Sequence, residues 1–127
     1  MALDTGHELV AADFDVVVDS SVGSAAVNFS SPTGIVKTMF DGNLIYFFLI
    51  ITSTNSITAT ADNIADTTIF TLDSAYWPSE EVPFAFAYAA GGGWGTITTA
   101  GLVTIRTAVE TIPAAATLRL TATYMLG

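Results

Sequence analysis

The sequence predicts an all-β protein, and three observations indicate this. Val, Ile and Thr, which favour strands, are abundant along the whole chain. Gly, Pro and Asn interrupt the apolar runs at short intervals, as turns do between strands. No segment shows a sustained 3.6-residue hydrophobic period bounded by helix caps. We therefore expect little or no helix and an antiparallel β-sandwich, most simply one of the jelly-roll type.

The expected strands are segments that are apolar or alternating and that lie between turn residues. In chain order they cover residues 8–19, 24–30, 35–40, 44–52, 56–60, 67–72, 82–89, 94–99, 102–107 and 116–126. Breaks are expected at residues 31–34, 41–43, 54–55, 78, 91–93, 100–101 and 113. The three glycines of residues 91–93 are interpreted as a flexible turn.

Residues 1–20 form the most acidic and least regular part of the chain. They lack the cationic start and the apolar core of a secretory signal, so synthesis in a host cytoplasm is expected. Two interpretations stay open for this segment. It is either the first strand of the sandwich or an arm that docks on a neighbouring molecule through Leu3, Leu9 and Val10. The sandwich domain itself is expected over residues 21–127.

The most apolar run, "LIYFFLII" at residues 44–51, is far shorter than the roughly 20 residues that a helix needs to cross a bilayer. We interpret it as a buried strand. Asp41-Gly42 before it suits a primed hairpin turn, because Gly tolerates a positive φ. Ala100-Gly101 predicts a second hairpin, in which Ile97 faces the same layer as the apolar residues of the next strand.

The last expected strand alternates between apolar and polar residues, which predicts one buried and one solvated face. The buried set is Leu118, Leu120, Ala122 and Tyr124, and the solvated set is Arg119, Thr121 and Thr123.

Charge and composition exclude several functions. The net charge is −9, and Lys37, Arg106 and Arg119 are the only cations. Such a chain cannot assemble the phosphate-neutralising surface that nucleic-acid binding requires. The absence of Cys excludes disulfides and thiolate metal sites. The acidity is interpreted as a means of keeping a chain with 51% hydrophobic residues soluble.

Catalytic and metal-binding patterns are weak. His7 is the only His, so a Ser-His-Asp or Cys-His nucleophile is not expected. Glu80 and Glu81 are adjacent, and adjacent side chains on an extended chain point in opposite directions. A hydrolase that uses carboxylates alone would need two acids about 5–9.5 Å apart, which a sequence does not reveal. We expect no enzymatic activity.

Two acidic groups carry oxygen ligands that Ca²⁺ could use, but neither has the spacing of a twelve-residue calcium loop. They are Asp13, Asp15 and Asp19, and Asp62, Asn63 and Asp66. We expect neither a metal nor a cofactor.

Residues 75–105 concentrate two Trp, two Tyr, two Phe and five Gly around only two charges. An aromatic-Pro segment, Tyr76-Trp77-Pro78, leads into the apolar strand 82–88, and an "I-x-x-x-G-x-V-x-I" hairpin precedes a closing strand that ends in Tyr. The hairpin residues are Ile97, Gly101, Val103 and Ile105, and the closing strand covers residues 118–124. Over residues 72–126 this pattern resembles the head domains of bacteriophage fibre and receptor-binding proteins.

The resemblance implies a fold similar to the jelly rolls of complement C1q and tumour necrosis factor, and therefore a tight homotrimer. It also implies a non-enzymatic virion structural protein, with other virion proteins as partners. Because only a short leader precedes the strands, capsid decoration, a head fibre or a spike is expected before a complete tail fibre. The residues expected at the trimer interface are Tyr46, Phe48, Phe84, Phe86, Tyr88 and Tyr124.

The alternative is a receptor-binding adhesin at a fibre tip, which would recognise a host-surface glycan. Exposed aromatic rings stack on sugars, and carboxylates accept their hydroxyl protons. Trp77, Trp94 and Tyr88 are the candidate platforms, with Asp73 or Glu81 as polar partners. The other interpretation of these aromatic residues, as core or interface side chains, stays open.

Overall fold

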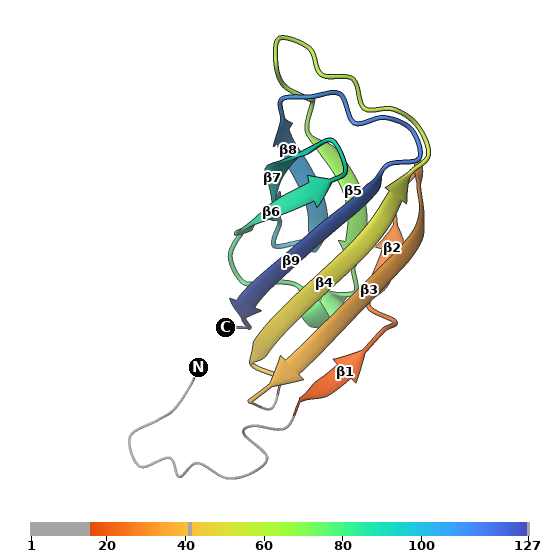
Figure 1. Cartoon of the computed structure of the whole chain (residues 1–127). Coiled ribbons are helices and arrows are strands. Elements are labelled where there is room, and N and C mark those ends of the chain that lie inside the picture. The colour runs from red at the N-terminus through yellow and green to blue at the C-terminus, as the bar shows by residue number, and fades with distance from the viewer. Residues whose placement is uncertain (1–15, 41, 127) are drawn as a thin grey trace.

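The computed structural model describes residues 16–40 and 42–126, and all of their strands belong to one antiparallel sheet (Figure 1). In chain order the elements are β1 (Val17–Asp19), β2 (Gly23–Ala25), β3 (Phe29–Met39), β4 (Leu44–Ser53), β5 (Thr67–Leu72), the 3-10 turn η2 (Ser74–Tyr76), β6 (Val82–Tyr88), β7 (Gly91–Ile97), β8 (Leu102–Ala108) and β9 (Thr117–Met125). The order of strands across the sheet is β1-β3-β4-β9-β6-β7-β8-β5-β2. The prediction of an antiparallel all-β fold is confirmed.

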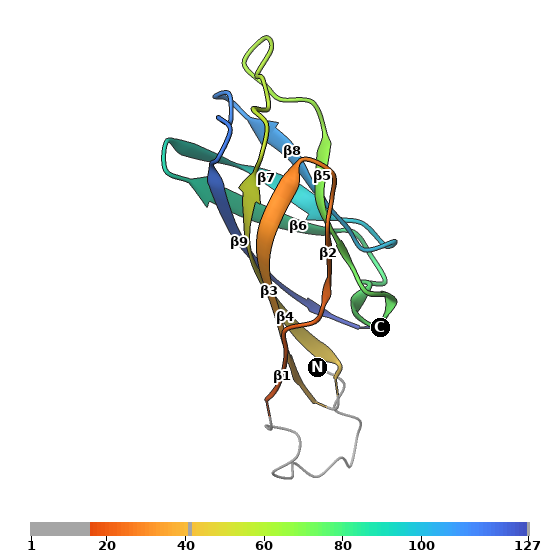
Figure 2. The same ribbon diagram turned by 90° about the vertical axis from the view of Figure 1, so that its right-hand side faces the viewer.

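The sheet is curled, so that its two halves face each other. We call β1, β3, β4 and β9 the β4 half, and β6, β7, β8, β5 and β2 the β8 half. Between the halves, β6 and β9 share just two residue pairs, Phe86 with Leu120 and Ala87 with Arg119. The far edge strand β2 comes back to contact β3, and Figure 2 shows β2 lying between β3 and β5. The curl therefore encloses one apolar interior.

The core fills this interior from both halves. Along β4, alternate residues Ile45, Phe47, Leu49 and Ile51 are fully buried. The ring of Phe47 meets the ring of Phe70 from β5, with centroids 6.0 Å apart and the planes tilted by 31°. Each such side chain contributes about 1.5–3 kcal/mol when it leaves water. Burial of two stretches that are distant in sequence thus holds the halves together.

The closing strand behaves as its alternation predicts. On β9 the side chains of Leu118, Leu120, Ala122 and Tyr124 are buried, and those of Arg119, Thr121 and Thr123 are exposed. The two hairpin predictions also hold where the structure describes them, because Gly42 has φ +85° and Gly101 has φ +77°. Glycine adopts this left-handed backbone without the steric cost that a Cβ would bring.

Two predictions near the beginning of the chain are wrong. Residues 24–30 are not one strand, since β2 ends at Ala25 and β3 begins at Phe29, with Asn28 at φ 70° between them. Residues 31–34 are not a break, since β3 continues through them with a bulge between Ser30 and Thr33. β1 pairs with β3 only over residues 36–38. At Pro32, the edge of β3 on the side of β1 therefore has no β1 residue to which a backbone N–H would need to donate. A proline is tolerated in such a position.

Two further predictions are corrected by contacts between distant segments. Residues 56–60 form no strand and make only isolated bridges, Ile57 to Ile112 and Thr60 to Asn63. The glycines of residues 91–93 belong to β7 and not to a turn. A Cβ on Gly93 would collide with the backbone carbonyl of Thr107 on β8. Glycine is therefore required here for close approach of two strands, and the turn before β7 falls at residues 89–90.

Part of the N-terminal segment belongs to the sheet. Residues 17–19, inside the segment that the sequence assigned to an arm or to a first strand, form β1 and pair with β3. Among the residues that the structure describes, no helix is long and apolar enough to cross a membrane.

Candidate contact surface

The solvent side of β4 is as apolar as its buried side. Leu44, Tyr46, Phe48 and Ile50 alternate with the core residues, and Tyr46 is exposed while the other three are half-buried. In most antiparallel sheets the solvated side of a strand is polar. An apolar outer side on a strand in the middle of a half-sheet is therefore a candidate contact surface.

The strand register shows which side chains join β4 on this side, because directly paired residues lie on the same face of a sheet. One row contains Lys37, Tyr46 and Thr123. The next row contains Ile35, Phe48 and Thr121, and Ile50 pairs with Arg119 beyond it. We call this surface the outer face, and it consists of Val18, Thr33, Ile35, Lys37, Met39, Leu44, Tyr46, Phe48, Ile50, Arg119, Thr121, Thr123 and Met125.

The charge of the outer face is opposite to that of the chain. It carries two of the three cations, Lys37 and Arg119, in a chain of net charge −9. Strands β3, β4 and β9 contain no Asp or Glu. The ammonium of Lys37 lies 5.9 Å from the centre of the Tyr46 ring, an arrangement that favours a cation over an aromatic face. The outer face is thus apolar and mildly cationic.

A hollow opens at one end of the outer face, beside β1. It measures about 280 Å³ and is lined by Val16, Lys37, Thr38, Met39, Leu44, Tyr46 and Thr123. Its walls are almost entirely apolar, because Lys37 and the threonines contribute their carbon chains. An apolar side chain from a partner would fit there.

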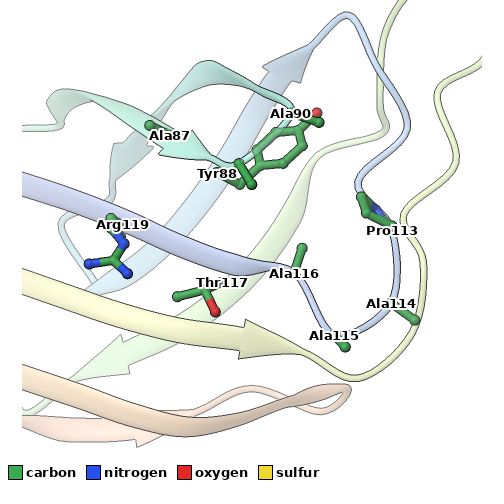
Figure 3. A pocket seen from close by; sticks show the side chains of 10 residues that line it. Ala87, Tyr88, Ala90, Pro113, Ala114, Ala115, Ala116, Thr117 and Arg119 are labelled. Carbon is green, nitrogen blue, oxygen red and sulfur yellow. The ribbon is translucent and has the colours of Figure 1, made fainter.

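A larger groove of about 680 Å³ lies at the other end, between the β6–β7 turn and the loop before β9 (Figure 3). It is lined by Ala87, Tyr88, Ala89, Ala90, Pro113, Ala114, Ala115, Ala116, Thr117 and Arg119. Ala87 and Arg119 also line a neighbouring hollow of about 270 Å³ that reaches Phe48. The groove therefore presents mostly methyl groups, with one guanidinium, and contains no pair of carboxylates that could act as acid and base.

The structure does not bring the three candidate sugar platforms together, and Tyr88 is buried. Trp77 is 40% exposed, its Nε1 donates a hydrogen bond of 2.7 Å to the carbonyl of Leu72, and its ring lies against Gly101. Trp94 is 48% exposed and pairs with Thr107 in the ladder between β7 and β8. Gly101 and Thr107 are six residue steps apart along the chain, which corresponds to about 20 Å of extended strand.

The polar partners proposed for sugar binding have different surroundings. Asp73 is exposed beside Trp77, and its backbone N–H donates to the carbonyl of Val22 at 2.8 Å. Glu81 is engaged by Arg106, whose guanidinium lies 3.0 Å from Glu81 and 2.7 Å from Asp66.

Arg106 acts as a clamp between three parts of the chain. Besides both carboxylates, it binds the hydroxyl of Thr96 on β7 through Nε at 2.7 Å. The hydrogen bond from the Thr96 hydroxyl, and then that from Arg106, hold the pKa of Glu81 below its usual value. Arg106 thus holds one oxygen of Glu81 and one of Asp66, although both carboxylates stay more than half exposed.

The six residues expected at a trimer interface divide into two groups. Tyr46 and Phe48 lie on the outer face. Phe84, Phe86, Tyr88 and Tyr124 are buried inside the chain's own core, with at most 8% of their surface exposed. Such side chains have almost no surface left to offer to another copy. The other proposed contact residues, Leu3, Leu9 and Val10, lie outside the described residues.

Three of the residues considered for a metal, Asp19, Asn63 and Asp66, have partners within the chain. The Oδ1 of Asn63 accepts the backbone N–H of Ala108 at 3.1 Å. Asp19 accepts the hydroxyl proton of Tyr76, and this hydrogen bond lowers the pKa of Asp19. Within residues 16–40 and 42–126, no three His, Cys, Asp or Glu side chains gather where they could hold a metal ion. Asp13 and Asp15 lie outside these ranges.

The sequence missed Lys37 and Arg119 as members of one surface. The alternation of β9 already indicated that Arg119 points outward, but the residues beside it are set by the order and register of distant strands. The chain matches no protein-family model and no curated protein.

Proposed function

We propose that this chain is a virion structural protein that works by contact, as a jelly-roll homotrimer displayed on a phage particle as capsid decoration, head fibre or spike. The observation that carries the proposal is the outer face. Among the described strands, it combines exposed or half-buried Tyr46 and Phe48 with a complete lack of carboxylates on β3, β4 and β9. Contiguous apolar surface of this kind is typical of protein contact sites.

The charge pattern favours a cyclic trimer rather than a twofold dimer. In a twofold dimer the same patch meets itself, which would place Lys37 and Arg119 of one copy against the same cations of the other. In a cyclic trimer, the outer face meets a different surface of the next copy. The rest of the chain is strongly acidic, so that surface would be of opposite sign. Both the apolar contact and the charges then favour a heterologous interface.

The test is the solution mass of the purified chain, measured by light scattering, followed by its return to particles that lack it. A trimer of 13.2 kDa chains that occupies capsid lattice positions is expected for decoration. Phe48→Asp places a charge at the centre of the outer face and should yield monomers. Val109→Asp is the matched control, because Val109 is 60% exposed and belongs to none of the outer-face strands. A wild-type chain that is monomeric and does not bind to the particles would refute the proposal.

The exposure of Trp77 and Trp94 favours a second candidate, an adhesin that binds host glycans at a fibre tip. The two rings lie on different parts of the β8 half, so each would act as a separate platform. Trp77→Ala combined with Trp94→Ala should abolish glycan retention and leave the oligomeric state unchanged. Wild-type protein that is not retained by any host polysaccharide would remove this candidate.

A further inference from the structure

The chain enters the described structure at the edge of the outer face. Val16 is 51% exposed and lines the apolar hollow together with Lys37, Leu44 and Tyr46. Val18, two residues later, pairs with Lys37 and so lies on the same side of the sheet. Residues 1–15 are therefore attached directly beside the outer face.

The sequence of residues 1–15 complements that surface in charge and in apolar character. It contains four acids, Asp4, Glu8, Asp13 and Asp15, and no Lys or Arg. It also contains Leu3, Leu9, Val10 and Phe14. The outer face has the reverse composition, with two cations, no acid on its central strands and a row of apolar side chains. The acids of residues 1–15 can thus pair with the cations of the outer face, and their apolar side chains can pack on its apolar side chains.

The length of the segment also fits. Fifteen residues reach at most about 50 Å when extended, while the ten residues of β4 span about 33 Å. Because the segment is tethered at the face, its effective concentration there is of millimolar order. Exposed ion pairs are individually weak, and the tether favours even a weak contact because it is intramolecular.

We propose that residues 1–15 dock on the outer face of their own chain, covering Tyr46 and Phe48 and bringing their carboxylates to Lys37 and Arg119. The docked segment shields an apolar surface in the free chain, and a partner that uses this surface must displace it. This regulatory consequence rests on the proposed function, whereas the docking itself does not. A second copy is a poorer occupant when it presents the same face, because its cations would meet cations.

The experiment uses the full chain, which has no Cys, so that Ala2→Cys carries a nitroxide label at one defined position. Methyl resonances are recorded with the label oxidised and reduced. Selective broadening at Leu44 and Ile50, with Leu102 and Val109 unaffected, is expected. Leu102 and Val109 are matched reporters, because they are exposed on β8 and just beyond it. Equal broadening at all four residues, or none at Leu44 and Ile50, would overturn the docking.

Two further measurements separate the alternatives. At a concentration at which light scattering shows only monomers, labelled chains are mixed with isotope-enriched chains that carry no nitroxide. No broadening is expected, and broadening at Leu44 in that mixture would show that the segment binds a second copy, which overturns the intramolecular contact. In the full labelled chain, Lys37→Gln with Arg119→Gln, or 1 M salt, should reduce the broadening. Unchanged broadening in both cases would refute the charge complementarity.

A deletion of residues 2–15 distinguishes this inference from the proposed function. If both are correct, the truncated chain should self-associate at lower concentration than the full chain. Selective broadening in the full chain, combined with a truncated chain that stays monomeric, would support docking and count against assembly through the outer face. Assembly of the full chain without any selective broadening would support the proposed function and refute docking.

Discussion

Two neighbouring phenylalanines give the sharpest test of the structure. Phe47 and Phe48 are adjacent on β4, but Phe47 is fully buried and Phe48 lies half-buried on the outer face. Each is changed to Ala in a separate variant. Both variants lose the same atoms, so any difference between them reports which side of the strand is enclosed.

The expected magnitudes follow from burial. Phe47→Ala leaves a cavity against Phe70 and should lower the free energy of unfolding by about 3–5 kcal/mol. Domains of this kind are stable by about 5–15 kcal/mol, so this loss is a large part of the total. At this chain length, 1 kcal/mol shifts Tm by about 4 °C, which gives a decrease of about 12–20 °C. Phe48→Ala should cost about 1 kcal/mol or less, because its ring is partly solvated.

Urea unfolding and thermal circular dichroism measure both values. The same samples are then compared by light scattering, where Phe48→Ala should weaken self-association more than Phe47→Ala does at temperatures at which both are folded. If, in the chain that lacks residues 2–15, Phe48→Ala is as destabilising as Phe47→Ala, then the strands themselves enclose the outer face. The assignment of this side of β4 as a contact surface would then be wrong.

Three further predictions concern the clamp, the tyrosines and the glycine strand. Arg106→Met should lower the free energy of unfolding by about 1 kcal/mol at low salt and by less at 1 M salt, as measured by urea unfolding, because its ion pairs are exposed. The hydrogen bond to Asp19, and then burial, raise the pKa of Tyr76 from 10.0 to about 12, so the unfolded chain ionises first and stability should fall as pH rises from 10 to 12. Tyr76→Phe should make this fall shallower without removing it, because burial also raises the pKa of Tyr124, and an unchanged pH profile would contradict the prediction. Gly93→Ala should cost about 3 kcal/mol or more, because its Cβ meets a carbonyl of β8, whereas Gly91→Ala should be tolerated, since its nearest contact, at 3.3 Å, is a tyrosine hydroxyl.

Much of the strand pattern could be predicted because it depends on near neighbours. The strand at residues 67–72 has its predicted bounds, and β4, β6 and β8 differ from prediction by one residue at one end. Alternation and turn glycines are local signals, and they were sufficient to predict the bounds of these four strands. The failures occurred where distant contacts decide the outcome. At Gly93 a neighbouring strand requires glycine inside β7, and at Pro32 a strand continues because one of its sides lacks a ladder.

The candidate surface shows the same division. The sequence showed that Phe84 and Phe86 are separated by a small residue and that residues 44–51 are apolar throughout. It did not show which side of each strand faces the core. In the structure, β6 turns its phenylalanines inward, while β4 has large apolar groups on both sides. Four of the residues expected at an interface consequently belong to the core.

By itself, the sequence determined that this chain forms strands, where most of them begin and end, that its charge is strongly negative, and that the outward side of β9 carries Arg119. These properties follow from composition and from a period of two residues. Only the tertiary structure decided that Lys37 and Arg119 share one surface with Tyr46 and Phe48. The physical reason is that a strand's own residues set its alternation, whereas its neighbours and their register are set by the burial of the whole sheet.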